Sequence, residues 1–468
     1  MSSTPLRTLA AACSALMLGA CASFSPDGGF SSVQQSAQQR LGKELVWARS
    51  EADQAAIAQR VRALLAAPLS ADAAVQLALL NNRGLQAAFQ DLGITEAELV
   101  QAGRLANPGF SIGRLRRGHD LEIERSLHLN LAQLISRPWT QALEARRFEQ
   151  VQAQAAGAVL SLAAGTRKAW VLAVTADESQ RYAVQVLQAA EAGAELARRM
   201  EQAGNFSALQ RAREQAFRAD AALALTRATQ ARLAAREQLT RLLGLTGEQR
   251  AFTLPDRLPD LPAQLPDQPD VERLAMDQRV DVQAARLAVA ATAQQLGLTR
   301  RTRFINVLEL AALRNSASNE PAQRGWELSF ELPLFDWGEA RVARAEAIYM
   351  KALHQAADTA VQAQADVRQA YAASRASHAM ARQHVEEIVP LRKRIADENL
   401  LRYNGMFIGV FELLADARAQ IAGVNAAIEA KRDYWLAQAD LDMALIGPPR
   451  FNAVAGAALP AEAAAPAH

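Results

Sequence analysis

The chain changes twice from the periodicity of a β-strand to the composition of a long helix. In residues 328–347 (LSFELPLFDWGEARVARAEA), apolar and polar side chains alternate up to Leu332, and an alanine-rich run begins after Gly338. Residues 127–147 (LHLNLAQLISRPWTQALEARR) show a similar change about 200 positions earlier. Alternation indicates a two-faced strand, and alanine favours a helix. A junction that occurs twice predicts an internally duplicated chain.

Other segments repeat at a similar offset and define the repeating unit. Each copy is expected to contain a helix, two strands, a long helix, a hairpin turn and a closing helix. The fold class predicted from this order is α+β, with long helices continuous with short strands. The further matching pairs are 83–93 with 279–291, 209–215 with 414–420, and 239–245 with 441–447.

The helices are expected to be much longer than those of compact domains. No proline lies between Pro138 and Pro255 or between Pro333 and Pro390, and these windows are rich in good helix formers. A helix over residues 139–202 would be roughly 100 Å long at ~1.5 Å per residue. Pro390 falls inside the second long helix and is expected to bend it, which would help that hairpin to move.

Turn signals divide each helical region into a hairpin. Gly204-Asn205 and Asn404-Gly405 interrupt the helical composition, and Ser207 follows the first of them as a helix cap. Each return helix ends at a glycine, the usual C-terminal stop signal. Each copy therefore contains an αα-hairpin.

The N-terminus resembles a bacterial lipoprotein signal. Residues 1–20 form a short apolar segment that ends in Leu-Gly-Ala directly before Cys21. This pattern predicts cleavage before Cys21 and a covalent lipid on it, with Ala22 favouring the outer membrane. The alternative is an ordinary signal peptide with a chance cysteine. Cys13 is removed with the signal, and with a lipid on Cys21 the mature chain would have no free thiol and no disulfide, which excludes cysteine chemistry.

Proline content and the repeat give the domain boundaries. Residues 21–40 are predicted to be a lipid-attached tether, and residues 255–270 a proline-rich linker between the copies. The first copy covers 41–254, with strands at about 107–133 and a helical hairpin at about 138–245. The second covers 271–447, with strands at about 303–333 and a hairpin at about 338–446; residues 448–468 are predicted to be a disordered tail.

The bulk composition argues against several functional classes. Lys plus Arg number 51 and Asp plus Glu 49, so no basic surface suggests nucleic acid. No metalloprotease, nucleophile-elbow or phosphate-loop motif occurs, so an enzyme is not expected and no cofactor is predicted beyond the lipid. His378, Met380 and His384 lie close on one helix and could bind a soft metal. Met380 and His384 are four residues apart, and a single Met/His pair at this spacing is more often part of an ordinary helix surface. No metal site is predicted.

The predicted strands have one apolar and one polar face. Acidic residues mark the polar face: Glu122, Glu124, Glu327 and Glu331. Alternation over about 10 residues is typical of membrane-barrel strands. Four strands cannot close a barrel, and an open edge cannot lie in lipid, so copies of the chain must combine. The alternative is a soluble four-stranded sheet packed on helices.

If the acidic face lined a pore, the wall would favour cations. The alternative is an incidental polar face whose charge is offset by arginines near the rim, at positions 114, 116 and 117.

The ordered set of features resembles the TolC-type outer membrane factors, especially their lipoprotein branch. The resemblance rests on the N-terminal signal, the duplication, the hairpin tips, the junction 332–341 (LPLFDWGEAR) and the ending 441–447 (LDMALIG). It implies a homotrimer with a twelve-stranded barrel in outer membrane lipid and a helical barrel extending into the periplasm. It also implies an efflux exit duct that docks to a periplasmic adaptor protein and an inner-membrane transporter.

The resemblance also assigns roles to residues. A periplasmic gate in the family uses acidic residues just after the second tip, where Glu412 matches. The second acid would fall on Ala415, so Asp416, one helical turn from Glu412, takes its place as a candidate. The tips are candidate adaptor contacts, with hairpin packing as the alternative for Phe206. The tip residues are Gly204, Asn205, Phe206, Gly405, Met406 and Phe407.

Two other functions fit parts of this pattern. The same fold would serve as the exit duct of a one-step protein secretion system, and partner proteins would decide between the two. A lipid-anchored helical adaptor or scaffold fits less well, because it would carry one long hairpin rather than two, each preceded by strands.

Overall fold

The computed structural model describes residues 23–304, 307–318 and 320–449, which form two compact units interleaved along the sequence. Cys21 and most of the predicted tail lie outside the described residues. The first unit contains residues up to Arg60, Leu79–Leu160 and Met276–Gln364. The second contains Val61–Ala78, Ser161–Ala275 and the residues from Ala365. The long helices α6 and α10 contribute residues to both.

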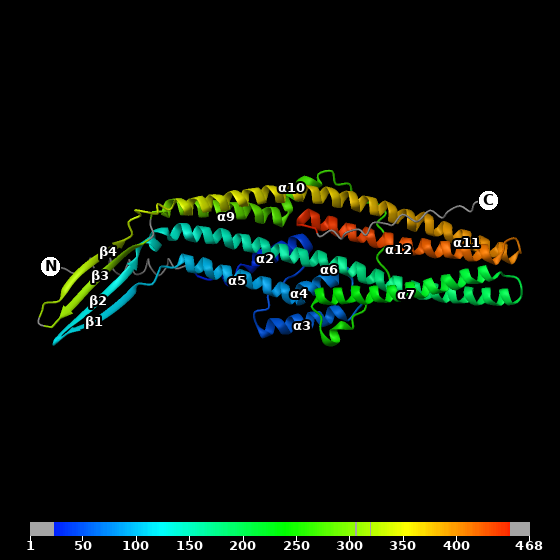
Figure 1. Cartoon of the computed structure of the whole chain (residues 1–468), viewed down its shortest axis with the longest axis horizontal. Helices are drawn as coiled ribbons and strands as arrows, with labels where there is room; N and C mark the ends of the chain where they lie inside the picture. The colour runs from blue at the N-terminus through cyan, green and yellow to red at the C-terminus, as the bar shows by residue number, and fades with distance from the viewer. Residues whose placement is uncertain (1–22, 305–306, 319, 450–468) are drawn as a thin grey trace. The chain divides into compact units, whose positions relative to one another are not determined.

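The first unit contains the strands. They form one antiparallel sheet in the order β1-β2-β3-β4 (Figure 1). Residues of the two copies meet in the middle of this sheet, where β2 pairs with β3, for example Leu129 with Leu310. The bounds are β1 Gly109–Arg117, β2 Asp120–Asn130, β3 Leu308–Ala317 and β4 Gln323–Phe330.

Helices on either side of the strands follow the predicted repeat. Helix α5 (Arg83–Gly103) precedes the first strand pair and α6 (Leu131–Gln202) follows it. Helix α9 (Val280–Thr302) precedes the second pair, and α10 (Glu339–Gln383) follows it. The element order therefore confirms the duplication.

The first strand-to-helix junction lies earlier than Pro138. Helix α6 begins at Leu131, directly after β2, because the Asn130 side chain accepts a hydrogen bond from Gln133 N at 2.8 Å. Pro138 lies inside the helix. The cap residue Asn130, rather than the proline, sets the boundary.

The second junction uses a longer connection. Asp336 Oδ1 accepts a hydrogen bond from Gly338 N at 2.7 Å, one residue before α10 begins. Gly338 has a φ of 75°, and a Cβ there would lie 2.7 Å from Arg303 O. Only glycine fits this turn without strain.

The segment predicted as a tether is partly helical and packed. Residues 30–41 form α2 (Phe30–Leu41), and the connected helix α3 (Glu51–Leu65) follows. The Phe30 ring lies 5.0 Å from that of Phe89 on α5 and 5.8 Å from that of Trp47. These aromatic side chains provide apolar packing for the segment. Its serine- and glutamine-rich composition gave no sign of this packing.

The second unit consists of helices. Its hairpins are formed by α6 with α7 (Ala208–Leu243) and by α11 (Val389–Asn404) with α12 (Val410–Ile446) (Figure 1). One cluster of its core contains Ala275, Val367, Ala370 and Ala444. This unit also contains residues of α3, α4 (Ala71–Asn81) and α8 (Val271–Gln278), and a short 3-10 helix (Gly247–Arg250). Alanine at these positions lets the helices approach closely.

The proline-rich linker contains no helix or strand, and it packs on the helices of the second unit. Pro262 O accepts a hydrogen bond from His378 Nε2 at 2.8 Å, and Pro259 O accepts one from Trp435 Nε1 at 3.2 Å. The Tyr371 hydroxyl donates to Asp267 at 2.9 Å. The linker thus joins α10 to α12.

The second long helix is interrupted just before Pro390. A π-helical turn spans His384–Ile388, and α11 follows with Pro390 in its first turn. A proline has no N–H to give to the carbonyl four residues earlier, and a wider turn accommodates this. The irregularity expected at Pro390 therefore takes the form of a π turn.

Among the described helices, none is both long enough and apolar enough to cross a bilayer.

Candidate functional site: strand faces, junction and helical tips

The sheet has a polar, acidic face. Residues paired across antiparallel strands lie on the same face. Glu124 pairs with Gly113 and Asn315, and Glu122 with Leu115 and Ala317. By the same register Glu309 and Glu327 lie on this face. Three of the four predicted glutamates therefore lie on one face of the sheet, spread along its length. Glu309 lies on the same face and was not predicted, because its strand alternates poorly in sequence.

The fourth predicted glutamate lies elsewhere. Glu331 follows the last residue of β4, Phe330. Its backbone N–H still donates to Val307 O at 3.4 Å. It is exposed at the helical end of the sheet rather than within the strand face.

A hydrogen-bonded cluster occupies the same polar face. Ser126 Oγ lies 2.7 Å from His128 Nε2 and 2.5 Å from Ser111 Oγ. Ser126 is buried, so its hydroxyl is satisfied by these neighbours. The cluster contains no carboxylate, and it ties β1 to β2.

The opposite face is apolar and exposed. One cross-strand row contains Phe110, Leu127, Ala312 and Trp326, and Trp326 is 74% exposed. The next row toward the helices contains Leu129, Leu310 and Leu328. Soluble proteins rarely leave such a continuous apolar surface in water. This face is suited to lipid.

Aromatic and basic residues surround the junction between strands and helices. The rings of Phe304 and Trp337 meet edge to face at 6.2 Å, and the Arg303 guanidinium lies 4.2 Å from the Phe304 ring centre. Arg301 lies 5.3 Å from the ring centre of Trp139. Such a mixture is typical of the boundary between lipid and water.

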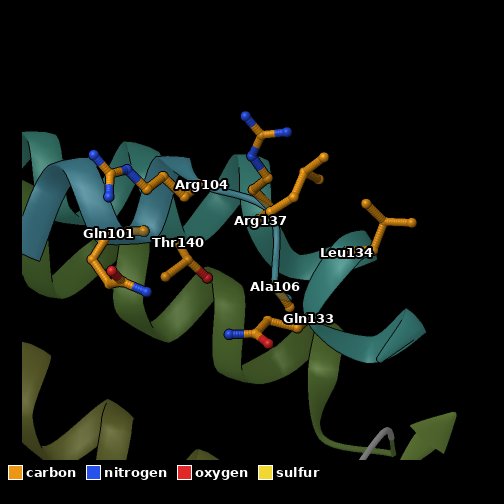
Figure 2. A pocket seen from close by; sticks show the side chains of 9 residues that line it. Gln101, Arg104, Ala106, Gln133, Leu134, Arg137 and Thr140 are labelled. Carbon is orange, nitrogen blue, oxygen red and sulfur yellow. The ribbon is translucent and has the colours of Figure 1, made fainter. Parts of the chain in front are cut away.

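A small cavity of about 60 Å³ lies at this junction, between the end of α5 and the start of α6. Figure 2 shows Gln101 and Arg104 at the end of α5, and Gln133, Leu134 and Thr140 on the first part of α6. Arg137 Nε donates to Gly103 O at 2.9 Å and so caps the C-terminus of α5. The cavity lies within the packing contact between the end of α5 and the start of α6.

The first helical tip is a regular turn. Gly204 takes a φ of 76°, and Asn205 N donates to Met200 O at 2.8 Å. Ser207 and Gln210 form a reciprocal capping box that starts α7. Phe206 is half-buried, in keeping with packing inside the hairpin.

The second tip has the same hydrogen bonding but a different residue in the left-handed position. Phe407 N donates to Arg402 O at 2.9 Å, and Met406 takes a φ of 63°. Gly405, in the dipeptide that predicted the turn, has a φ of −80°. Met406 and Phe407 are 92% and 83% exposed. A strained turn that exposes two large apolar side chains is typical of a binding tip.

The two predicted gate residues differ in environment. Glu412 lies exposed in the first turn of α12, one turn before Asp416. Asp416 is half-buried and accepts a hydrogen bond from Asn399 Nδ2 on α11. Their role in a gate stays a prediction.

The sequence did not single out a charge pair that links the two hairpins. Arg418 on α12 donates to the Glu214 carboxylate on α7, whose side chain is 2% exposed. Arg418 also lies 5.1 Å from the Phe217 ring centre, and Arg213 lies 5.6 Å from that of Phe411. Arg213 and Arg418 occupy matching positions in 209–215 and 414–420. This correspondence between the two copies is the sequence signal that could have pointed to the Arg418–Glu214 pair.

A second charge pair lies deeper among the helices of the same unit. Lys168 Nζ on α6 lies 2.8 Å from Asp440 Oδ1 on α12, and both side chains are nearly buried. Burial raises the pKa of Asp440, and Lys168 acts in the opposite direction. Burial likewise raises the pKa of Asp442, which Arg167 contacts at 3.3 Å.

The residues considered for a soft metal do not converge. The His378 ring is engaged by Pro262 O and packs against Tyr434, while Met380 is exposed. Over the described ranges, no group of three His, Cys, Asp or Glu side chains is arranged to hold a metal ion.

The comparisons with known proteins agree with this architecture. No family model matches the chain. The chain is 27% identical over 288 residues to the cobalt-zinc-cadmium resistance protein CzcC of Cupriavidus metallidurans. The match covers 58% of this chain and 64% of that protein, so it spans slightly less than two thirds of this curated relative.

Solved structures match over most of the chain. The CmeC outer membrane channel of Campylobacter jejuni gives a TM-score of 0.69 at 18% identity, covering 88% of this chain and 91% of that one. The MtrE outer membrane channel of Neisseria gonorrhoeae gives 0.67 at 21% identity, covering 83% and 89%. These proteins are described as channels rather than enzymes, which agrees with the absence of catalytic motifs. The chain therefore has the fold of these outer membrane channels, as its resemblance to the TolC-type outer membrane factors predicted.

Proposed function

We propose that three copies of this chain form an outer membrane channel, the exit duct of a tripartite efflux pump. One observation carries the proposal: the sheet is open, with β1 and β4 at its two edges. Backbone groups at an edge have no partners in lipid, so a lipid-facing sheet must close on itself. Three copies supply twelve strands, enough for a barrel with an acidic inner face.

The helical tips support docking to a periplasmic adaptor protein. The exposed Met406 and Phe407 form the apolar end of one hairpin, and Gly204 and Asn205 form the exposed end of the other. A lipid on Cys21 would add an anchor to the outer membrane. The adaptor would in turn connect the duct to an inner-membrane transporter.

Metal cations are the solute class that we propose for the duct. The face that would line the barrel carries Glu122, Glu124, Glu309 and Glu327 from one protomer. Rings of carboxylates favour cations over anions. The name of the relative CzcC refers to cobalt, zinc and cadmium resistance, which points to the same class.

The molecular mass and the conductance test the channel. The full chain, purified in detergent, is expected to have three times the mass of a protomer by light scattering corrected for bound detergent. It is expected to conduct ions in a planar bilayer. A monomer that does not conduct would refute the proposal.

The solute class needs a separate test. Deleting the gene should increase sensitivity to zinc, cobalt and cadmium more than to organic drugs, and the wild-type gene should restore resistance. Greater sensitivity to drugs alone would overturn the metal assignment while leaving the duct intact. A secretion defect without any change in sensitivity would favour a one-step secretion duct.

A further inference from the structure

The apolar face of the sheet carries a row of arginines near its outer end. Arg125, Arg314 and Arg324 pair across β2, β3 and β4, so they are neighbours on one face. Arg114 and Arg116 lie further out on the same face of β1, where they pair with Ile123 and Leu121. We call Arg125, Arg314 and Arg324 the arginine row.

The charge of the arginine row is not balanced by acidic partners. Within the described part of the chain, none of these three arginines forms an ion pair; Arg125 Nη1 lies 3.4 Å from Ser316 Oγ. The glutamates of the strands lie on the opposite face. Like charges directly opposite each other on neighbouring strands repel. An anionic ligand at this position would relieve the repulsion.

On β3 and β4 the arginine row marks the outer limit of an apolar band. Below it, on β4 and the segment that follows, large side chains are exposed: Trp326, Leu328, Phe330, Leu332 and Leu334. At ~3.3 Å per residue the part from Trp326 to Leu332 spans at most ~20 Å, which fits within the ~25 Å apolar band of outer membrane barrels. The chain turns after it, where Leu334 N donates to Leu332 O at 2.8 Å. Arginine is costly at the middle of a bilayer and tolerated near its surface. With the apolar face in lipid, the row would lie at the level of the lipid headgroups.

We propose that the arginine row binds the phosphate groups of the phosphorylated glycolipid in the outer leaflet. This inference rests on the proposed function, because it requires the apolar face to meet an outer membrane. Guanidinium groups bind phosphate oxygens through paired hydrogen bonds, and three adjacent arginines suit a headgroup with more than one phosphate. In a trimer the rows would form a basic belt around the barrel.

The test measures lipid binding by the full chain in detergent. The probes are purified bisphosphorylated lipid A, the same lipid after removal of its phosphates, and phosphatidylglycerol. Binding is measured for the wild type, for R125Q/R314Q/R324Q and for the lysine version of the same triple substitution. The matched control is R227Q/R286Q/R394Q, which removes three exposed helix arginines and the same total charge.

The wild type is expected to bind bisphosphorylated lipid A at least 10-fold more tightly than the dephosphorylated lipid. The glutamine triple variant should lose this preference, the lysine version should keep part of it, and the control should keep all of it. Unchanged preference in the glutamine variant would overturn the inference, as would equal affinity of the wild type for phosphatidylglycerol.

Conductance separates this inference from the proposed function. A wild type that conducts, together with unchanged lipid preference in the glutamine variant, would reject the arginine row alone. A wild type that neither trimerises nor conducts would reject the duct as well. Circular dichroism confirms that each variant is folded before binding is measured. Should the glutamine variant unfold, the lysine version and Arg324→Gln alone are compared, and unchanged preference in Arg324→Gln would count against the row.

Discussion

Arg418 donates a hydrogen bond to Glu214, although the two residues lie 204 positions apart and belong to different copies of the repeat. The pair joins the return helices of the two hairpins near their tips. Arg418→Ala would leave the Glu214 carboxylate buried without its cation, a change that typically costs about 3–5 kcal/mol. Because the hairpins would then separate more easily, we expect higher single-channel conductance and a lower melting temperature.

The control for this pair is the double variant Glu214→Leu/Arg418→Leu. It removes both charges, so its melting temperature should stay closer to that of the wild type than that of Arg418→Ala. Identical conductance and melting temperature in Arg418→Ala and the wild type would show that the pair does not hold the hairpins together.

Substitutions of Met406 and Phe407 distinguish the effect of backbone strain in the turn from the effect of these side chains on adaptor binding. Met406→Gly should stabilise the turn by roughly 1 kcal/mol, because glycine adopts a positive φ without steric cost. It should also weaken adaptor binding, since it removes an exposed apolar side chain. Phe407→Ser should weaken binding without stabilising the turn. Pull-down with the purified adaptor and thermal melting give the two readouts, and full adaptor binding by both variants would argue against docking at this tip.

Lys168 and Asp440 predict a pH dependence of stability. The pKa of Asp440 is raised above its ordinary value of 3.8, chiefly by burial. The folded state therefore binds this proton more readily than the unfolded state does. The contribution of Asp440 to the free energy of unfolding is greatest below pH 3.8 and falls as pH rises through the raised pKa.

The matched variants test whether the pair or the burial dominates. Asp440→Asn leaves Lys168 buried beside a neutral group and should lower the free energy of unfolding by about 3 kcal/mol. Lys168→Met/Asp440→Leu should be nearly neutral and should lack the pH dependence of Asp440. Urea unfolding between pH 4 and pH 8 measures both; an unaltered pH profile in the double variant would rule out Asp440 as its source.

Leu328 and Ser329 test which face of the sheet meets lipid. Leu328→Arg would place a charge on the apolar face and should cost about 2–4 kcal/mol per protomer if that face lies in the bilayer. We expect loss of assembled trimer from the outer membrane fraction. Ser329→Arg lies on the acidic face and should assemble normally, with reduced cation selectivity in reversal-potential measurements. The opposite pattern would reverse the assignment of the two faces.

Pro390→Ala tests the π turn at His384–Ile388. An alanine restores the missing N–H donor, so a regular α-helix becomes available to α10 and α11. If the irregular turn permits movement of the hairpin, efflux measured by resistance of the complemented strain should fall while trimer assembly is kept. Unchanged resistance would show that the turn has no part in opening.

The helical tips show the limit of local sequence signals. Gly204 was predicted to lie in a turn, and in the structure it takes a left-handed conformation there. At the second tip the dipeptide Asn404-Gly405 predicted the turn, but Met406 takes the left-handed position. The hydrogen bonds from Met406 and Phe407 to the preceding turn of the helix determine which residue this is. The turn propensity of Asn404-Gly405 predicted that a turn exists at this tip. The point where the helix ends decided which residue takes the left-handed position.

By itself the sequence determined the duplicated order of elements and the alternating faces of the strands, because both follow from periodicities that each segment carries locally. Only the tertiary structure decided how distant segments combine. It placed β2 beside β3, gathered Arg125, Arg314 and Arg324 into one row, and paired Glu214 with Arg418. These contacts depend on strand register and helix packing between residues about 200 positions apart, and no local pattern specifies either.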